Sequence, residues 1–301
     1  PSLTIAAERI VFGGGPAGGT FQVVANAIQV YDPVKASKDY RVKAQSSAGS
    51  VENLRKVNSG KMDFGVVYSG HVYLGRNGKL KNDTKKYENV MAVSYLYGAP
   101  AQLVVRKDSG ITSTKDLIGK KVGVGNAGSG AFANCELFFT HMGIWDKIER
   151  NAMGYNDAAA AFGNNQLDAF WLFTAFPSGA VIMAAQTNDI DLVDLDKDAE
   201  DSKFFETYPY FSKLTVPAGT YKGQSEDIHS IGLWSLILVR PDLADETAYR
   251  LVRAMHLGHD EFTARLPQGR YTQAANTVNY VPAELLHPGA RKFYEEIGFL
   301  P

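Results

Sequence analysis

The chain has 301 residues, of which 45% are hydrophobic and 21% charged, and this is enough for two domains of about 100–200 residues each. The formal net charge is -1 and no long run of Lys or Arg occurs, so the charge pattern excludes a nucleic-acid partner. No uninterrupted apolar stretch reaches the roughly 18 residues of a membrane-spanning helix. We therefore expect a globular protein that does not itself span a membrane.

The start of the chain and its cysteine content bear on location and chemistry. The sequence begins Pro1-Ser2-Leu3, without Met or a signal pattern, which favours a mature chain whose export signal has been removed. Cys135 is the single cysteine, so we expect no disulfide within the chain. It shares an apolar helical face with Phe138 and Phe139, which favours a buried structural cysteine over a thiol nucleophile.

The first structured stretch is an apolar run over 10–12, a glycine-dense turn over 13–19 and a helical pattern that begins at Thr20. Glycine permits positive φ and lets other atoms approach the backbone, and Thr20 can cap a helix whose apolar face starts with Phe21. The stretch predicts a strand, a loop and a helix N-terminus. Such a terminus carries partial positive charge and unbonded N–H groups, so it can hold an anion.

Two further strands are predicted over 40–45, where apolar and polar residues alternate, and over 62–68. Between them, Ser50 is a natural N-cap for a helix that ends before Gly60. The order strand, helix, strand, helix, strand implies a parallel sheet with right-handed crossovers. Ligands of such sheets bind beyond the carboxyl ends of the strands.

A polar stretch over 75–88 follows. Its basic part, from Arg76 to Lys86, is interpreted first as a solvated loop and second as a docking surface for a partner. Two apolar runs come next, over 89–96 and 102–106, with Tyr97-Gly98-Ala99-Pro100 between them. We place a crossover between two domains at this Gly/Pro break.

A second α/β unit repeats the pattern of the first. Ser113 with Asp116 resembles a capping box, and residues 121–124 form a strand pattern. The strand runs into a Gly/Ser loop over 125–130, and the next helix starts at Ser129 or Gly130. A second helix N-terminus is therefore expected to face an anion.

The same unit continues with an alanine-rich helix that starts at Asn156-Asp157 and ends at Gly163. A buried strand over 167–173 then leads into residues 174–179, where Pro177 is compatible with a first helical turn. This is a third passage from a strand into a helix.

The rest of the chain contains no third complete α/β unit. Residues 196–229 have the composition of a loop, a strand is predicted over 232–239, and Asp242 caps the helix after it. We expect the chain to cross back and complete the first domain. The predicted lobes are 1–98 with 227–301, and 99–226, with hinge crossovers near 97–101 and 222–230.

The opening glycines also match a nucleotide-binding motif. Gly13, Gly15 and Gly18 fit Gly-x-Gly-x-x-Gly, which expects an acidic residue at the end of the second strand. That strand ends at Gln45, and the nearby acids Asp32 and Asp39 precede it. Binding of a small anion is favoured, while a nucleotide- or NAD-using α/β enzyme and a glycine turn without a ligand stay open as alternatives.

Other catalytic patterns are mostly absent, including the Gly-x-Ser-x-Gly, Ser-x-x-Lys and His-Glu-x-x-His motifs. His256 and His259, with Asp260 and Glu261, are spaced for a metal on a helix, but a solvated helix face is favoured because no partner cluster stands out. We expect no enzymatic activity, no metal and no cofactor.

Aromatic residues fall at or beside the predicted strand ends. Each of them fits core packing as well as a pocket wall, but their shared location favours a small-molecule cleft, which is apolar with a few placed polar groups. The set is Phe21, Tyr68, Trp171, Phe173 and Tyr221.

Several segments in the same order resemble one known family. They are residues 13–21, 48–54, 106–111, 116–122 with 128–130, and 216–221. Together they cover nearly the whole chain and resemble the TAXI family of extracytoplasmic solute receptors, which serve TRAP transporters. The resemblance implies an α/β, type II periplasmic-binding-protein fold, with two lobes that each have a central mixed sheet flanked by helices and with the ligand in the interlobe cleft. It also implies delivery of a small carboxylate to an integral-membrane TRAP permease, and relatives of this kind bind glutamate or 2-oxoglutarate-like acids.

The expected ligand is a small organic anion, such as a dicarboxylate, a 2-oxo acid or an acidic amino acid. Helix termini, hydroxyls and amides can hold it without a basic side chain. Arg106 and Arg240 follow strands without forming a clear clamp, and neutralisation by an arginine stays open as an alternative. Closure at the hinges would trap it. The candidate ligand-binding residues are Gly15, Thr20, Phe21, Ser47, Ser50, Asn53, Tyr68, Asn126, Ser129, Gly130, Phe173, Thr174 and Tyr221.

The sequence departs from the family's pattern at Pro16-Ala17 and at Tyr68-Ser69-Gly70-His71, both at the expected pocket edge, so the substrate is not carried over from relatives. We expect a periplasmic monomer. A non-transport small-molecule sensor is a further alternative to the receptor.

Overall fold

The computed structural model describes residues 7–31, 34 and 40–301. The strands are β1 (Glu8–Gly13), β2 (Tyr40–Gln45), β3 (Phe64–Tyr68), β4 (Met91–Arg106), β5 (Lys121–Gly123), β6 (Glu149–Asn151), β7 (Ala169–Phe173), β8 (Ile190–Leu192), β9 (Ser212–Val216) and β10 (Ile228–Val239). The helices are α1 (Thr20–Val30), α3 (Ser50–Asn58), α4 (Ser69–Arg76), α5 (Gly130–His141), α6 (Tyr155–Gly163), α7 (Gly179–Thr187), α8 (Asp196–Asp201), α9 (Phe204–Thr207), α10 (Asp245–Leu257), α11 (His259–Arg265), α12 (Ala274–Tyr280) and α13 (Pro288–Glu296). Short 3₁₀ helices span Thr114–Leu117, Trp145–Lys147, Pro267–Tyr271 and Ala283–Leu285. Asp32 and Asp39 lie outside the described residues.

The chain forms two compact units. The first comprises Pro1–Gly15, Phe21–Tyr97 and Trp234–Pro301, and the second comprises Pro16–Thr20 and Gly98–Leu233. The strands β4 and β10 pass from one unit into the other.

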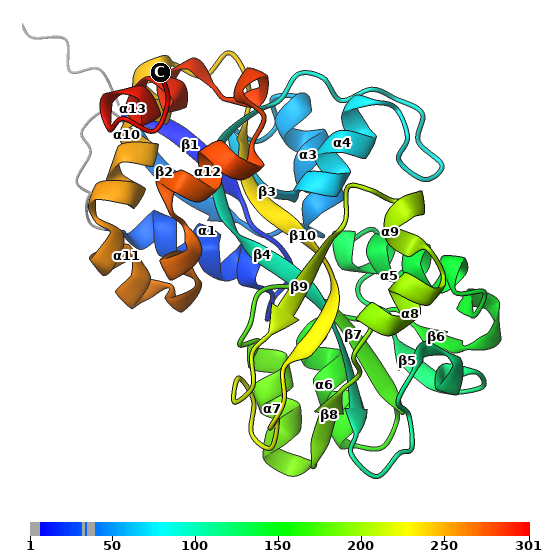
Figure 1. Ribbon diagram of the computed structural model, residues 1–301. Coiled ribbons are helices and arrows are strands. Elements are labelled where there is room, and N and C mark those ends of the chain that lie inside the picture. Colours follow the sequence, from blue (N-terminus) through cyan, green and yellow to red (C-terminus); the bar gives the residue numbers. More distant parts are fainter. Residues whose placement is uncertain (1–6, 32–33, 35–39) are drawn as a thin grey trace, which may run out of the picture. The chain divides into compact units, whose positions relative to one another are not determined.

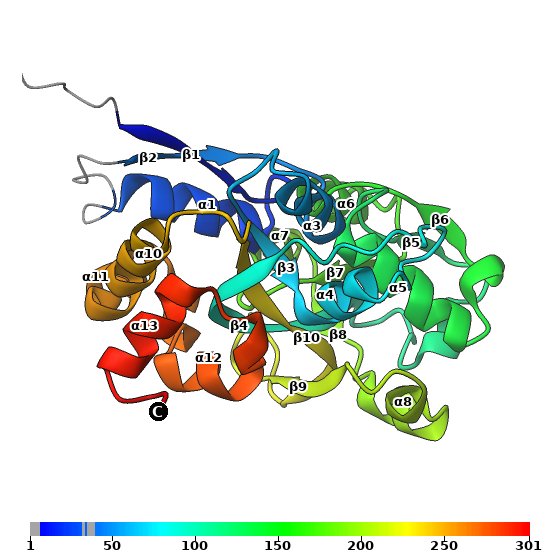
Figure 2. The ribbon, with the colours of Figure 1, turned by 90° about the horizontal axis from the view of Figure 1, so that it is seen from above.

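In the first unit, β1 lies between β2 and β3 and is parallel to both, and β10 pairs antiparallel with β3. The helices α1 and α3 connect these parallel strands in opposite directions across the sheet. Because such crossovers are right-handed, α1 and α3 cover opposite faces, as Figures 1 and 2 show. The parallel sheet predicted from residues 10–68 is confirmed.

The second unit has the same strand order. β5 lies between β6 and β7 and is parallel to both, and β4 pairs antiparallel with β7. β8 adds to β4, and β9 pairs antiparallel with β10. The mixed α/β fold with flanking helices predicted for each unit is therefore confirmed, and the carboxyl ends of β5 and β7 lie at one edge of the sheet.

The strand pattern continues through the Gly/Pro break at which we placed a crossover between two domains. β4 continues from Met91 to Arg106 through Gly98 and Pro100, and the change of unit falls between Tyr97 and Gly98. Nearly every residue of this strand is buried. Burial of the apolar side chains before Gly98 and after Pro100 therefore stabilises one continuous strand. The carbonyl of Pro100 accepts a hydrogen bond from the Thr174 N–H at 3.3 Å, so this proline still contributes an acceptor.

Residues 196–229 are more regular than predicted. They contain α8, α9 and β9, and the first residues of β10 begin at Ile228 rather than near 232. The strand β9 has only five residues, and its exposed positions carry Lys213 and Thr215. Because charged residues flank β9, the short alternation of its exposed and less exposed residues was not recognised as a strand.

Helix starts differ from the predictions at two serine or aspartate positions. α3 begins at Ser50 itself, with Gly49 before it at φ 111°, so Ser50 does not cap the helix. α10 begins at Asp245, and Asp242 instead forms an ion pair with Arg240 at 2.7 Å. The predicted capping box is confirmed, because the Asp116 carboxylate accepts from the Ser113 N–H at 2.9 Å. Pro177 precedes α7 in a cis peptide bond with Phe176 rather than lying in the first turn.

Cys135 lies in the core of the second unit. Cys135 is fully buried, and burial raises the pKa of its thiol well above the usual value, so the buried structural cysteine is confirmed.

His256 packs against Phe293 with ring centroids 5.6 Å apart, and its Nε2 lies 3.0 Å from the Tyr294 hydroxyl. The prediction of a solvated face is therefore wrong for His256. Within the described ranges, no group of three or more His, Cys, Asp or Glu side chains could hold a metal.

None of the described helices combines the length and the apolar character that a membrane span requires.

Candidate functional site

The loop between β1 and α1 in the first unit is tied down by one buried amide. Asn53, on α3, is fully buried, and its Nδ2 donates to the carbonyls of Gly14 at 2.7 Å and Val66 at 2.9 Å. Space for this side chain comes from Gly13 and Gly65, where an added Cβ would lie 2.9 Å and 3.0 Å from Asn53 atoms. The amide donors of Asn53 thus join the loop after β1 to β3, and a contact of Asn53 with a ligand stays a prediction.

The glycines of the opening turn are also explained by packing. A Cβ at Gly13 would lie 2.5 Å from the Met62 sulfur, and one at Gly14 would lie 2.5 Å from Gln22 Oε1. The Gly15 N–H donates to the same Gln22 oxygen at 3.3 Å. Since the protein's own side chains approach this backbone, the Gly-x-Gly-x-x-Gly spacing has a structural cause.

The serines that follow β2 bond to neighbouring backbone and side chains. Ser47 Oγ donates to the Gly14 carbonyl at 3.1 Å and accepts from the Gly49 N–H at 3.0 Å. Ser50 Oγ accepts from the Tyr68 N–H at 2.9 Å and lies 2.8 Å from Nδ1 of the buried His71. These contacts fix the ends of β2 and β3 relative to each other.

Two aromatic residues of the first unit lie together as predicted from their positions. The rings of Phe21 and Tyr68 are 4.7 Å apart, and the His71 ring lies 5.8 Å from Tyr68. Phe21 and Tyr68 are nearly buried, at 5% and 4% exposure. They form a packed apolar pair beside the ends of β1 and β3.

In the second unit, two threonine hydroxyls bond to each other. Thr20 Oγ1 lies 2.9 Å from Thr174 Oγ1, and both side chains are buried. Thr20 is the first residue of α1, and Thr174 follows β7 directly. Its hydroxyl therefore joins another loop instead of capping α1.

A buried polar chain continues from Thr174 to the start of α7. Gln102 Nε2 donates to the Thr174 carbonyl at 3.2 Å, and Gln102 Oε1 accepts from the Tyr221 hydroxyl. That hydroxyl in turn accepts from the Ser178 N–H at 2.8 Å. Burial raises the pKa of Tyr221, so the phenol stays protonated and keeps donating to Gln102.

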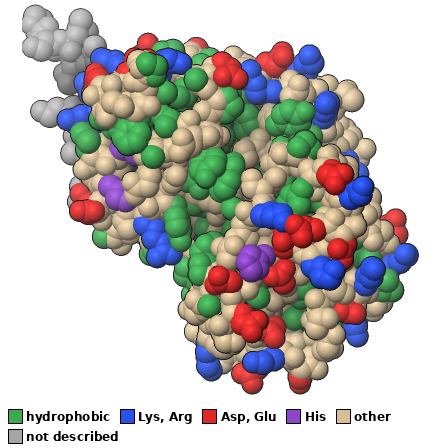
Figure 3. Space-filling view, in the orientation of Figure 1, with side chains coloured by type: hydrophobic (Ala, Val, Ile, Leu, Met, Phe, Trp, Pro, Cys, Tyr) green, Lys and Arg blue, Asp and Glu red, His purple; other side chains and the backbone are tan. Residues whose placement is uncertain are grey.

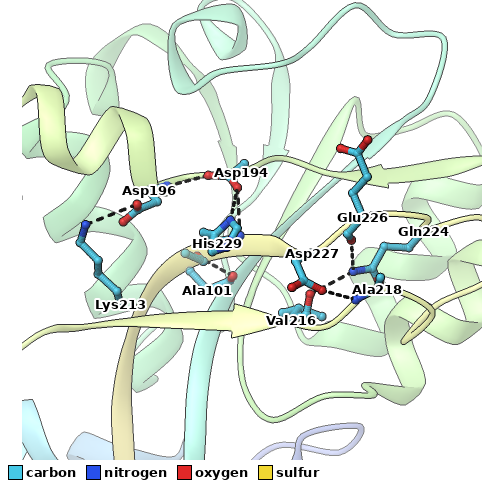
Figure 4. A network of polar contacts seen from close by, with 11 residues as sticks. Ala101, Asp194, Asp196, Lys213, Val216, Ala218, Gln224, Glu226, Asp227 and His229 are labelled. Atoms are coloured by element: carbon cyan, nitrogen blue, oxygen red, sulfur yellow. Dashed lines mark hydrogen bonds and ion pairs between the residues drawn. The ribbon is translucent and has the colours of Figure 1, made fainter.

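The turn that carries Tyr221 is held rigidly by side-chain hydrogen bonds, which Figure 4 shows from close by. Gln224 Nε2 donates to the carbonyls of Val216 and Glu226, each at 3.1 Å. Asp227 accepts from the Ala218 N–H at 2.7 Å. The Tyr221 hydroxyl is therefore presented by an ordered turn.

Phe173 is a core residue of the second unit. Its ring is fully buried and packs beside Trp171, with centroids 6.3 Å apart. The Tyr155 hydroxyl donates to the Phe173 carbonyl at 2.9 Å and accepts from its N–H at 3.2 Å. The backbone of Phe173, rather than its ring, lies at the loop that follows β7.

The loop after β5 agrees most closely with its prediction. Ser129 caps α5, since its Oγ accepts from the Phe132 N–H at 3.0 Å, and Gly130 is the first helical residue. Asn126 is half-buried in the same loop, and its Oδ1 lies 3.5 Å from the position of a Cβ on Gly154. The starts of α5 and α6 thus approach each other at Asn126.

Neither of the two arginines considered for a clamp is available to a ligand. The Arg106 guanidinium donates to the Leu167 carbonyl at 3.0 Å and stacks over the Phe162 ring at 4.1 Å. Arg240 forms ion pairs with Asp63 at 2.9 Å and with Asp242. Charges of both signs also alternate over the visible face of the second unit (Figure 3).

Sequence reasoning missed four polar residues of the candidate site. Gln102 was hidden in an apolar strand pattern, where a single buried amide is the only signal. Tyr155 and Ser178 precede or begin helices, and His71 was noted only as a departure from a family pattern. For Tyr155, Ser178 and His71, the available signal was a polar residue shortly after a strand.

The fold of this chain matches a known fold. The mixed sheets, with parallel strands flanked by helices and closed by an antiparallel strand, are those of periplasmic binding proteins. A model of the NMT1-like family matches residues 12–298, and the chain belongs to this family.

Solved structures share the fold at low identity. PhnD1 from Prochlorococcus marinus (MIT 9301), in complex with methylphosphonate, is 10% identical over 97% of this chain and 99% of that chain, with a TM-score of 0.58. A protein from Bordetella bronchiseptica RB50 is 14% identical over 96% and 98%, with a TM-score of 0.57. A putative L-cystine ABC transporter protein from Listeria monocytogenes is 16% identical over 88% and 98%, with a TM-score of 0.52.

Proposed function

We propose that the chain is a solute receptor that captures a small organic anion and performs no chemistry on it. The observation that carries the proposal is the set of loops that follow β1, β5 and β7, each of which runs into the first turn of a helix of at least nine residues. Helix N-termini favour negative charge, so such loops can bind an anion without a basic side chain. Membership of the NMT1-like family supports a binding role.

The proposed ligand is a carboxylate, such as a dicarboxylate, a 2-oxo acid or an acidic amino acid. The polar groups at the loop ends of the second unit are hydroxyls, amides and backbone N–H groups, and donors of this kind suit carboxylate oxygens. Asn126, Thr174 and the start of α5 are the proposed contacts in the second unit. In the first unit, the proposed contacts are Gly15, Ser47 and the apolar pair of Phe21 and Tyr68.

The proposal extends to the partner and the location. The segment resemblance to TAXI receptors supports delivery of the ligand to a TRAP-type membrane permease by a monomeric, periplasmic receptor, with hinge motion near 97–101 and 222–230. A many-spanning permease encoded beside this chain's gene, and transport that depends on both proteins, are the results we expect.

The test of the proposed function is calorimetry on protein that has been unfolded, stripped of ligand and refolded. Succinate, 2-oxoglutarate and L-glutamate are the titrants, and mass spectrometry of the small molecule that co-purifies adds an unbiased candidate. We expect saturable binding of at least one carboxylate. Silence with all three titrants and with the co-purified molecule would refute the proposal.

The nucleotide-using enzyme has weaker support. Its motif depended on the spacing of Gly13, Gly15 and Gly18, but Gly13 packs on Met62, and Gly18 packs on Asn156, where an added Cβ would lie 2.3 Å from Oδ1. NAD and ATP serve as negative titrants in the same calorimeter. Tight saturable binding of either would favour the enzyme over the receptor.

A further inference from the structure

The N-terminus of α7 has features that the receptor proposal does not yet use. α7 has nine residues, and Ser178 is its N-cap in an extended conformation at φ -95° and ψ 133°. The Ser178 side chain is only 3% exposed and accepts no hydrogen bond from the helix. Among the residues that the structure describes, its Oγ has no hydrogen-bond partner at all.

An unpartnered buried hydroxyl is costly. Burying such a group without a partner costs about 1–3 kcal/mol, and native proteins keep few of them. Ser178 Oγ also lies at the positive end of a helix dipole, where an acceptor with negative charge is favoured. A ligand oxygen would supply the missing acceptor.

The backbone beside this hydroxyl is open. Gly179, the first residue of α7, is exposed, and an added Cβ there would meet nothing within 4 Å. Its φ is not in the left-handed region, so the backbone does not require glycine. The lack of a side chain leaves the helix N-terminus accessible.

A chain of three hydrogen bonds fixes the position of this terminus. The Ser178 N–H donates to the Tyr221 hydroxyl, and that hydroxyl donates to Gln102 Oε1. Gln102 Nε2 in turn donates to the Thr174 carbonyl. Figure 4 shows the hydrogen bonds of Gln224 and Asp227, which order the turn over residues 216–227. Tyr221 belongs to this turn. The terminus is therefore preorganised, so that binding there costs little ordering entropy.

We propose that the N-terminus of α7 is a carboxylate-oxygen subsite of the receptor, in which Ser178 Oγ donates to the ligand, Gly179 leaves room for it, and Gln102 and Tyr221 are positioning residues. This inference rests on the proposed function and adds to it the group that recognises one end of the anion. No residue of the subsite is charged, so recognition depends on hydroxyl and backbone N–H donors.

The test uses the full chain, stripped of ligand, with succinate, 2-oxoglutarate and L-glutamate as probes. Gly179→Ala should raise or preserve the melting temperature, because alanine is a better helix former and meets nothing in the structure, yet it should weaken binding by at least about tenfold. Ser178→Ala should leave the melting temperature unchanged or higher and weaken binding by about three- to tenfold.

Two matched control variants test whether loss of any buried serine hydroxyl, or a methyl group added at any helix end, weakens binding. Ser235→Ala removes another buried serine hydroxyl without a partner, in the first unit, and Gly163→Ala places a methyl group in ordinary contact at the end of α6. Both should bind the probes like the natural chain.

Each outcome has one meaning. Natural protein that binds a probe while both α7 variants bind it equally well would overturn the subsite and leave the receptor proposal intact. A Ser178→Ala chain that melts several degrees lower would overturn the subsite by showing that the hydroxyl has a structural partner. If the natural protein binds none of the three probes, the receptor proposal and the subsite fall together.

Discussion

Thr20 Oγ1 lies 2.9 Å from Thr174 Oγ1, although the two threonines are 154 positions apart in the sequence. Both side chains are buried within the second unit. The two hydroxyls carry two protons between them but share one hydrogen bond, so one proton is left to donate elsewhere. We expect this proton to serve the bound anion.

Replacing Thr174 by valine keeps its shape and removes its hydroxyl. We expect Thr174→Val to weaken carboxylate binding by about tenfold and to lower stability by about 1 kcal/mol, because the Thr20 hydroxyl loses its partner. Calorimetry and urea unfolding measure the two effects. Thr174→Ser, which restores the hydroxyl, should recover most of the affinity, and a serine variant as weak as the valine variant would contradict the assignment.

Ser129 is expected to matter for stability through its cap on α5. Ser129→Ala removes the acceptor for the Phe132 N–H, so the free energy of unfolding should fall by about 1 kcal/mol. Urea unfolding at pH 7 measures it, and Ser129→Asp should restore the loss because aspartate caps helices equally well. An alanine variant as stable as the natural chain would show that the cap does not contribute.

Asn53 is expected to be a structural residue rather than a ligand contact. Asn53→Asp would place a carboxylate against the carbonyls of Gly14 and Val66, so we expect a loss of about 2–4 kcal/mol in the free energy of unfolding at pH 7. Asn126→Asp makes the same chemical change in a half-buried loop and should cost far less. Urea unfolding of the two variants compares them directly, and equal losses would be inconsistent with this role.

The strands and helices that the sequence predicted best are those with strong local patterns. The strand over 40–45 coincides with β2, and Ser129 caps its helix as expected, because alternation and capping are set by neighbouring residues. The N-cap predicted at Ser50 is wrong, and the contacts that Ser50 and Asn53 make could not be predicted, for the opposite reason. Their side chains bond to His71, Tyr68, Gly14 and Val66, which lie 13 to 39 positions away.

The candidate site was predictable as a location but not as a set of contacts. Parallel strands bring their carboxyl ends to one edge, so the loops after β1, β5 and β7 could be chosen from the order of elements alone. The chain of hydrogen bonds from Thr174 through Gln102 and Tyr221 to Ser178 joins three separate segments, because Thr174 and Ser178 lie in the same loop between β7 and α7. Long-range pairing of this kind leaves no periodic signal in a sequence.

His256 is expected to make the first unit sensitive to acid. Burial lowers the pKa of its imidazole to about 4 from the usual 6.5, and the neighbouring His259 adds to the decrease. The imidazole faces the Tyr294 hydroxyl at 3.0 Å and the Phe293 ring, and His259 is the one titratable group that shifts it through charge. Because the folded-state pKa lies below the unfolded value, the unfolded chain takes up the proton first. Stability from this group is therefore complete above pH 6.5 and falls as the pH drops toward 4.

The loss should reach about 2 kcal/mol at pH 5 and about 3 kcal/mol below pH 4. His256→Gln removes the titration and keeps an amide that can reach the Tyr294 hydroxyl. Urea unfolding between pH 7.5 and 4.5 should then show a shallower decline for the glutamine variant than for the natural chain. His287, whose pKa burial also lowers, is present in both proteins and contributes the same slope to each. Parallel declines would show that His256 is protonated as easily in the folded chain as in the unfolded one.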